Sequence, residues 1–121
     1  MASVVAEKLP DGREVGPIAT RVLFENDRVR IWEMNLAPGE STALHRHELD
    51  YVQVEIEGDK ISGLIEPGAG GTYRKSFEMD VNPGAYFWVE RGGFETAKNT
   101  GQKYYRGILI ELKEPRLGER G

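Results

Sequence analysis

With 121 residues, the chain is long enough to bury one hydrophobic core and too short for two ordinary domains. Its formal net charge of −4 argues against nucleic acid or an anionic membrane surface as a partner. Because it contains no cysteine, disulfides and thiolate metal sites are excluded, and any bound metal needs nitrogen and oxygen ligands.

The first 19 residues show no sustained hydrophobic period and are interrupted by Pro10, Gly12, Gly16 and Pro17. We therefore predict an irregular N-terminal arm over residues 1–19, lying on the folded domain or on a partner subunit. The start of the chain lacks a basic region followed by a long apolar stretch, and no later window approaches the length of a membrane-spanning helix. This predicts a cytoplasmic protein with no membrane partner.

Short strands, bounded by glycine, proline or asparagine, are predicted along the rest of the chain. Residues 20–25 and 29–36 are expected to form a hairpin around the turn-prone Asn26 and Asp27. Further strands are predicted over residues 51–57, 60–66, 73–81, 85–89, 94–98 and 104–112, with a hairpin loop at 67–71. No segment has the apolar period of an amphipathic helix. The pattern predicts a single all-β sandwich or barrel domain over residues 20–114, followed by a loose charged tail over residues 115–121.

The only two histidines, His45 and His47, stand two residues apart. In an extended strand, side chains two apart point to the same face, so one segment can present both imidazoles to one point in space. This arrangement is typical of metal ligands.

The spacing around these histidines resembles the first motif of the cupin superfamily. That motif reads Gly, five residues, His-x-His, three or four residues, Glu, six residues, Gly. Gly39 precedes His45 by six positions and Gly58 ends the following strand, but Tyr51 stands in place of the glutamate.

A second stretch resembles the second cupin motif, which reads Gly, five residues, Pro-x-Gly, two residues, His, three residues, Asn. Gly84, Gly92 and Asn99 keep this register, while Glu90 replaces the proline and Glu95 replaces the histidine ligand. The resemblance covers most of the chain, from about residue 21 to residue 112.

The resemblance implies an all-β fold, a cupin-type antiparallel jelly-roll β-barrel, assembled as a homodimer. It would bring Glu95 across from His45 and His47, giving a metal site of two imidazoles and one carboxylate. Non-haem ferrous sites use such a set, which also takes zinc, nickel or manganese, so the metal is a divalent Fe, Zn, Ni or Mn ion.

Two registers compete for the strand after the histidines, because a slip of one residue reverses every side chain. Counting back from Gly58 as the cupin motif does implies that Tyr51, Gln53 and Glu55 turn toward the pocket, and we favour this register. Hydrophobicity alone would instead turn inward the residues Asp50, Val52, Val54 and Ile56.

Three residues near the histidines are therefore candidate ligands or pocket residues. Tyr51 could ligate the metal, donate a hydrogen bond to a bound acid, or fill space. Asp50 is either a reserve carboxylate or a turn residue between two strands. Gln53 is a possible pocket residue in the favoured register.

Other side chains receive simpler interpretations. Arg46, between the histidines, is expected to point away from the metal. We expect the bulky aromatic residues to supply the barrel wall or an oligomer face and to be core residues rather than substrate-stacking ones; these are Trp32, Phe87, Trp88 and Phe94.

Jelly-roll barrels host oxygenases, decarboxylases, isomerases and plain binding proteins, so fold alone does not fix the function. We predict a metal-binding small cupin that acts on or binds a small carboxylate-bearing metabolite at His45, His47 and Glu95. The resemblance leaves open a metal-dependent dioxygenase, decarboxylase or isomerase, and no catalytic residue is assigned. The alternative is a metal-free cupin that binds or senses a small molecule without catalysis.

Overall fold

The computed structural model describes residues 7–113, which form β-strands and no helix. The strands are β1 (Glu7–Lys8), β2 (Glu14–Val15), β3 (Arg21–Glu25), β4 (Val29–Leu36), β5 (His45–Arg46), β6 (Tyr51–Glu57), β7 (Lys60–Ile65), β8 (Phe77–Asp80), β9 (Tyr86–Val89), β10 (Phe94–Lys98) and β11 (Tyr105–Leu112). Within this described part of the chain, no helix could cross a membrane. The predicted all-β fold is confirmed.

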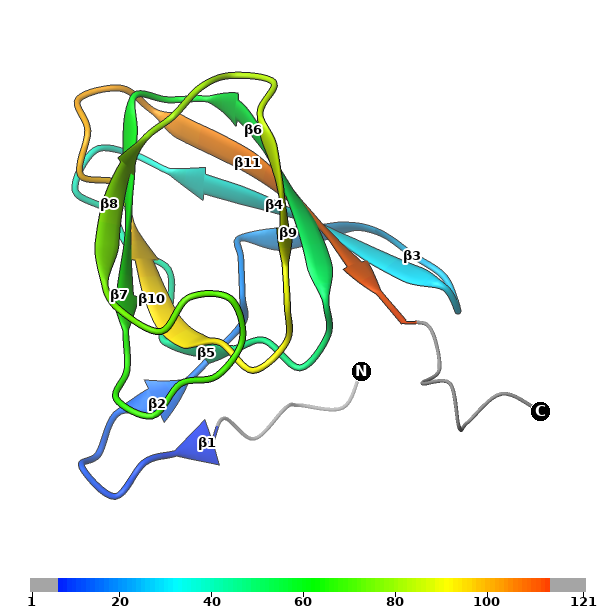
Figure 1. The fold of residues 1–121 in the computed structure, drawn as a ribbon, viewed down its shortest axis with the longest axis vertical. Coiled ribbons are helices and arrows are strands. Elements are labelled where there is room, and N and C mark those ends of the chain that lie inside the picture. Colours follow the sequence, from blue (N-terminus) through cyan, green and yellow to red (C-terminus); the bar gives the residue numbers. More distant parts are fainter. Residues whose placement is uncertain (1–6, 114–121) are drawn as a thin grey trace.

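Two antiparallel sheets face each other and enclose the barrel interior (Figure 1). One sheet has the order β5-β10-β7-β8, and the other has the order β3-β4-β11-β6-β9. Neighbours far apart in the sequence, such as β11 between β4 and β6, give the crossed topology of a jelly roll. The predicted hairpin around Asn26 is present as β3 and β4, because the Asn26 side chain accepts hydrogen bonds from the backbone of Arg28 and Val29.

Alternating side chains build the core between the sheets. In β11 every second residue is buried, beginning with Tyr105 and continuing through Leu109 to Glu111. Met34 and Leu36 of β4 meet them from the neighbouring strand. This alternation determines which side chains reach the interior and therefore which can form a site.

Of the two places predicted for Trp88, the structure contradicts the core of this domain, because 50% of the Trp88 surface is exposed. On β9, Phe87 packs against the core and Val89 is buried, so Trp88 between them must point outward. Trp32 packs against the core as expected. Phe94 is partly buried, and the Arg46 guanidinium lies 3.9 Å from the centre of its ring.

The described part of the N-terminal arm differs from the irregular structure predicted for it. Strands β1 and β2 pair as a small hairpin that lies below the barrel in Figure 1. Its side chains bind the same chain's barrel, through Glu7 with Arg46 and Arg13 with Glu66. Two-residue strands leave no periodic signal in a sequence. The tail predicted over residues 115–121 lies outside the described residues.

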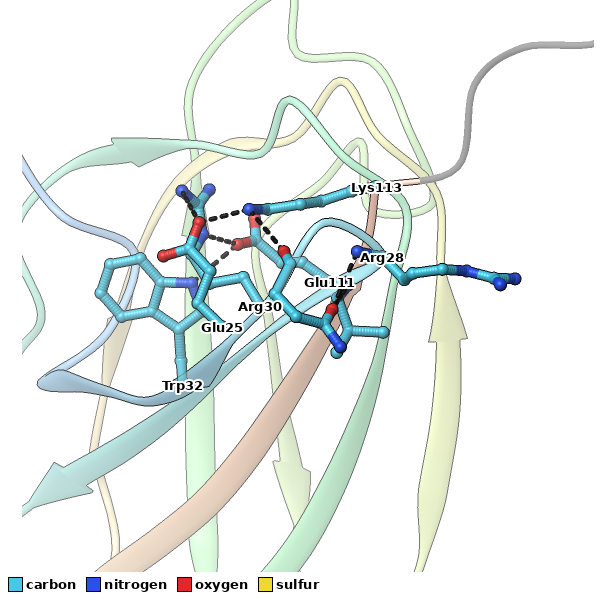
Figure 2. Close-up of polar contacts among 8 residues, drawn as sticks. Glu25, Arg28, Arg30, Trp32, Glu111 and Lys113 are labelled. Atoms are coloured by element: carbon cyan, nitrogen blue, oxygen red, sulfur yellow. Dashed lines mark hydrogen bonds and ion pairs between the residues drawn. The ribbon is translucent and has the colours of Figure 1, made fainter. Parts of the chain in front are cut away.

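A polar cluster fastens the ends of β3, β4 and β11 together (Figure 2). The buried Glu111 Oε1 accepts a hydrogen bond from Arg30 Nε at 2.6 Å and another from Trp32 Nε1 at 2.7 Å. Lys113 pairs with Glu25 beside them. Because a buried carboxylate is costly without partners, these contacts explain how Glu111 can occupy an inward position.

The glycines of the two motifs have a conformational role. Gly39, Gly58, Gly84 and Gly92 all have positive φ angles. At Gly92, with φ of 109°, the backbone N–H donates to the carbonyl of His47 at 2.8 Å. A side chain would strain this conformation, so glycine secures the contact between the second motif and the histidine strand.

Candidate metal centre

The structure brings His45, His47 and Glu95 together inside the barrel, with one ligand atom of each within 4.8 Å of the others. His45 belongs to strand β5 and pairs directly with Glu95 of the neighbouring strand β10. His47 N donates to the Gly93 carbonyl at 2.9 Å, which holds the second histidine beside the same strand. The contact between the two motifs thus assembles the cluster.

Both imidazoles aim the same ring atom at the carboxylate. His47 Nε2 lies 3.5 Å from Glu95 Oε2, and His45 Nε2 lies 3.8 Å from that oxygen. Two donors held 2.0–2.2 Å from one zinc ion lie about 3.0–3.6 Å apart, so only small adjustments would let the three share a cation.

Hydrogen bonding leaves the His45 Nε2 lone pair available. His45 Nδ1 lies 2.7 Å from the Ala43 carbonyl, which requires that Nδ1 carry the proton. Nε2 of His45 is buried and has no hydrogen-bond partner among residues 7–113. A backbone carbonyl on the far nitrogen is a typical partner of a metal-binding histidine.

Electrostatics favours the ligand forms of these groups. Burial, together with the neighbouring His47, lowers the pKa of His45 to about 4, so this imidazole is neutral at pH 7. Burial opposes ionisation of Glu95, but the nearby His47 and His45 outweigh it and lower the pKa of the carboxyl. A neutral imidazole and a carboxylate are the forms that bind a cation, and the residues present therefore fit a divalent metal ion.

Glycine at residue 93 gives the two ligand side chains of the cluster more room than another residue would. A Cβ atom there would lie 3.2 Å from Glu95 Oε1 and 3.3 Å from His47 Cδ2. Glycine at this position lets the two ligand side chains approach each other.

Tyr51 faces the interior, as the favoured register predicts. It is 1% exposed, and its ring stacks on His47 with 4.3 Å between centroids. Burial, followed by the charge of Glu95, raises the pKa of the phenol well above its ordinary value. Tyr51 therefore stays protonated and supports His47 by stacking.

A cavity of about 30 Å³ adjoins the cluster, enough for about two water molecules. Its polar lining residues are His47, Tyr51, Gln53, Ser62, Tyr73 and Glu95. Tyr73 comes from the loop between β7 and β8, because the strand predicted over residues 73–81 begins only at Phe77.

Asp50 lies outside the three-residue cluster and serves as a turn anchor. Its carboxylate accepts hydrogen bonds from the Arg91 backbone N–H and side chain at 2.9–3.1 Å. An outer hollow of about 280 Å³ lies on the other side of His47, between Arg46 and Arg91. Arg46 itself points away from the cluster and pairs with Glu7, as its place between the histidines predicted.

We expect Tyr51→Phe to change zinc affinity by no more than about threefold, because the protonated phenol is no ligand and the ring stack survives. Isothermal titration of the apo-protein with zinc measures this. A loss as large as that of Glu95→Gln would instead make Tyr51 a metal ligand.

Comparisons with known proteins agree with this architecture. No family model matches the chain. Auxin-binding protein T85 of Nicotiana tabacum is 24% identical over 98 residues, which cover 81% of this chain and 52% of that protein. Auxin-binding protein 1 of Arabidopsis thaliana is 28% identical over 98 residues, covering 81% and 49%. The chain thus spans about half the length of these curated relatives.

A solved cupin domain from Bordetella pertussis has the same fold, with a TM-score of 0.68 and 26% identity over 83% of this chain and 96% of that one. A jelly-roll barrel whose His-x-His segment faces an interior carboxylate defines a cupin-type barrel with a possible metal site. The chain belongs to the cupin superfamily.

Proposed function

We propose that this cupin holds one divalent cation with His45, His47 and Glu95 and binds a small carboxylate-bearing molecule there. The observation that carries the proposal is the convergence of both Nε2 atoms on Glu95 Oε2 inside the barrel. Three protein ligands leave positions open on a cation, as in catalytic sites. A cation in such a site acts as a Lewis acid on the bound molecule.

The surrounding residues would orient a ligand and exclude water. Tyr51 and Tyr73 line the small cavity beside the cluster, together with Gln53. Two curated relatives are named for binding auxin, which supports small-molecule binding by this barrel. Iron, zinc, nickel and manganese all accept this ligand set, so the metal is left to experiment.

Metal content of the untagged protein tests the proposal. We expect about one equivalent of a divalent metal by elemental analysis, and saturable binding of ferrous, zinc, nickel or manganese ions to the apo-protein. Absence of binding with all four ions would favour the alternative, a metal-free barrel that binds or senses a small molecule.

We also propose that the partner of this chain is a second copy of itself, as its resemblance to small cupins implies. The outer face of the five-stranded sheet supports this. Register partners place an unbroken apolar row across all five strands, formed by Phe24, Ile31, Ile110, Val52 and Trp88. Phe24 is 52% exposed and Trp88 is 50% exposed, whereas the open face of an antiparallel sheet is normally polar.

The next row of the same face contains Ile108, Val54 and Tyr86, with Glu33 at its end. The Glu33 carboxylate is already paired with Arg21 and Arg106, so covering this residue would not leave its negative charge unpaired. This outer apolar face, made of the two rows, is the proposed dimer surface.

A further inference from the structure

Behind the cavity lies a buried polar network that the metal cluster does not use. Glu55 and Tyr105 are both 0% exposed. Tyr105 Oη donates to Glu55 Oε2 at 2.8 Å, and Gln53 Nε2 lies 3.0 Å from each of these two oxygens. Gln53 connects this network to the cavity, whose wall it shares with His47 and Glu95.

The network determines the orientation of the Gln53 amide. Nε2 has two hydrogens, and the two oxygens of Glu55 and Tyr105 accept both. Since the Tyr105 hydroxyl donates its own hydrogen to Glu55, it can only accept from Gln53. A reversed amide would set its carbonyl oxygen against the Glu55 oxygen. These bonds engage Nε2, so Oε1, a hydrogen-bond acceptor, is the amide atom that could meet a ligand.

Packing keeps the network from relaxing. A Cβ atom at residue 107 would lie 2.5 Å from the Tyr105 hydroxyl oxygen, and one at residue 58 would lie 3.0 Å from its ring. Tyr105 is thus clamped between Gly58 and Gly107, and its hydroxyl is fixed in place. A rigid acceptor needs no reorganisation when a ligand binds. It therefore adds more affinity for a ligand with a matching donor than a mobile acceptor would.

We infer that Gln53 selects the ligand, accepting through Oε1 a hydrogen bond from a hydroxyl or amino group on the molecule bound at the cation. Glu55 and Tyr105 are the positioning residues that hold the amide. This inference rests on the proposed function and names the ligand class more narrowly, as a small carboxylate that carries a hydrogen-bond donor.

Glycolate and acetate are matched probes, since they differ by one hydroxyl. We measure the affinity of each for the zinc-loaded protein by calorimetry and take their ratio as the glycolate preference. A bond from the hydroxyl to zinc would be the same in all variants and would cancel between them. In Gln53→Met, which lacks the acceptor at similar size, we expect the preference to fall by about fivefold to tenfold.

Controls separate selection from general damage. Gln102→Met makes the same change in an exposed residue and should leave the preference unaltered. Tyr105→Phe removes one acceptor of Nε2, so it should lower the preference while zinc and acetate affinities hold. An unchanged preference in Tyr105→Phe would remove its positioning role.

A complex of the wild-type protein tests the inference without any variant. In a crystal structure with zinc and glycolate, the glycolate hydroxyl should lie within about 3.2 Å of Gln53 Oε1. A glycolate hydroxyl turned elsewhere, or an equal preference in wild type and Gln53→Met, overturns the inference and leaves the metal site standing. Failure of the wild-type protein to bind any of the four ions, ferrous, zinc, nickel or manganese, overturns the proposed function itself.

Discussion

Glu95→Gln is expected to weaken zinc binding by more than about 100-fold, the upper range for loss of a supporting residue around a metal. The amide keeps the shape of the side chain but loses the negative charge that attracts a cation between two neutral imidazoles. Glu95 is 8% exposed, so little water can replace its oxygen. Competition titration of the apo-protein with a zinc chelator measures the change.

Two further variants define the result. Glu78→Gln makes the same chemical change in an exposed strand residue and should leave zinc affinity unaltered. Glu95→His should retain zinc, because it restores the nitrogen donor that cupins place at this position, where the strand already faces inward. Equal affinity in wild type and Glu95→Gln would remove Glu95 from the site.

The sequence predicts the central part of this fold because local rules and tertiary structure agree there. Turn residues mark the strand ends, and motif glycines stand where the backbone requires positive φ angles. Residues two apart share a face, which is why His45 and His47 meet Glu95 once β5 pairs with β10.

Hydrophobicity alone would have reversed strand β6. Its polar residues Gln53 and Glu55 face the interior, while Val52 and Val54 lie on the outer apolar face. The observed register is the one that the resemblance to the cupin motif implied, counted back from Gly58. Such a reversal is typical of a barrel that has a polar site inside and an apolar surface outside.

Other features depend on contacts between distant segments and leave no local pattern. The buried network of Glu55 and Tyr105 joins residues 50 positions apart, and its hydrogen bonds appear only after β6 and β11 pair. Tyr73 reaches the cavity from an irregular loop. Alternation along β6 does predict that Glu55 turns inward, but it does not show which partner Glu55 meets.

Trp88→Lys is expected to convert the proposed dimer into a monomer, raising the dimer dissociation constant by about 30- to 1,000-fold, the range for losing an aromatic anchor. Trp88 ends the apolar row and pairs with Val52, so a lysine there would carry an unpaired charge into a dry interface. The fold of the monomer should tolerate the change, because 50% of the Trp88 surface is already exposed.

Sedimentation velocity at micromolar concentration distinguishes the possible outcomes of this experiment. Leu64→Lys is the matched control, since Leu64 is 46% exposed on β7 of the opposite sheet and should leave the dimer intact. Zinc binding should persist in Trp88→Lys, because the metal cluster faces the interior. A monomeric wild-type protein, or a Trp88→Lys variant as dimeric as Leu64→Lys, would show that the outer apolar face does not join two copies.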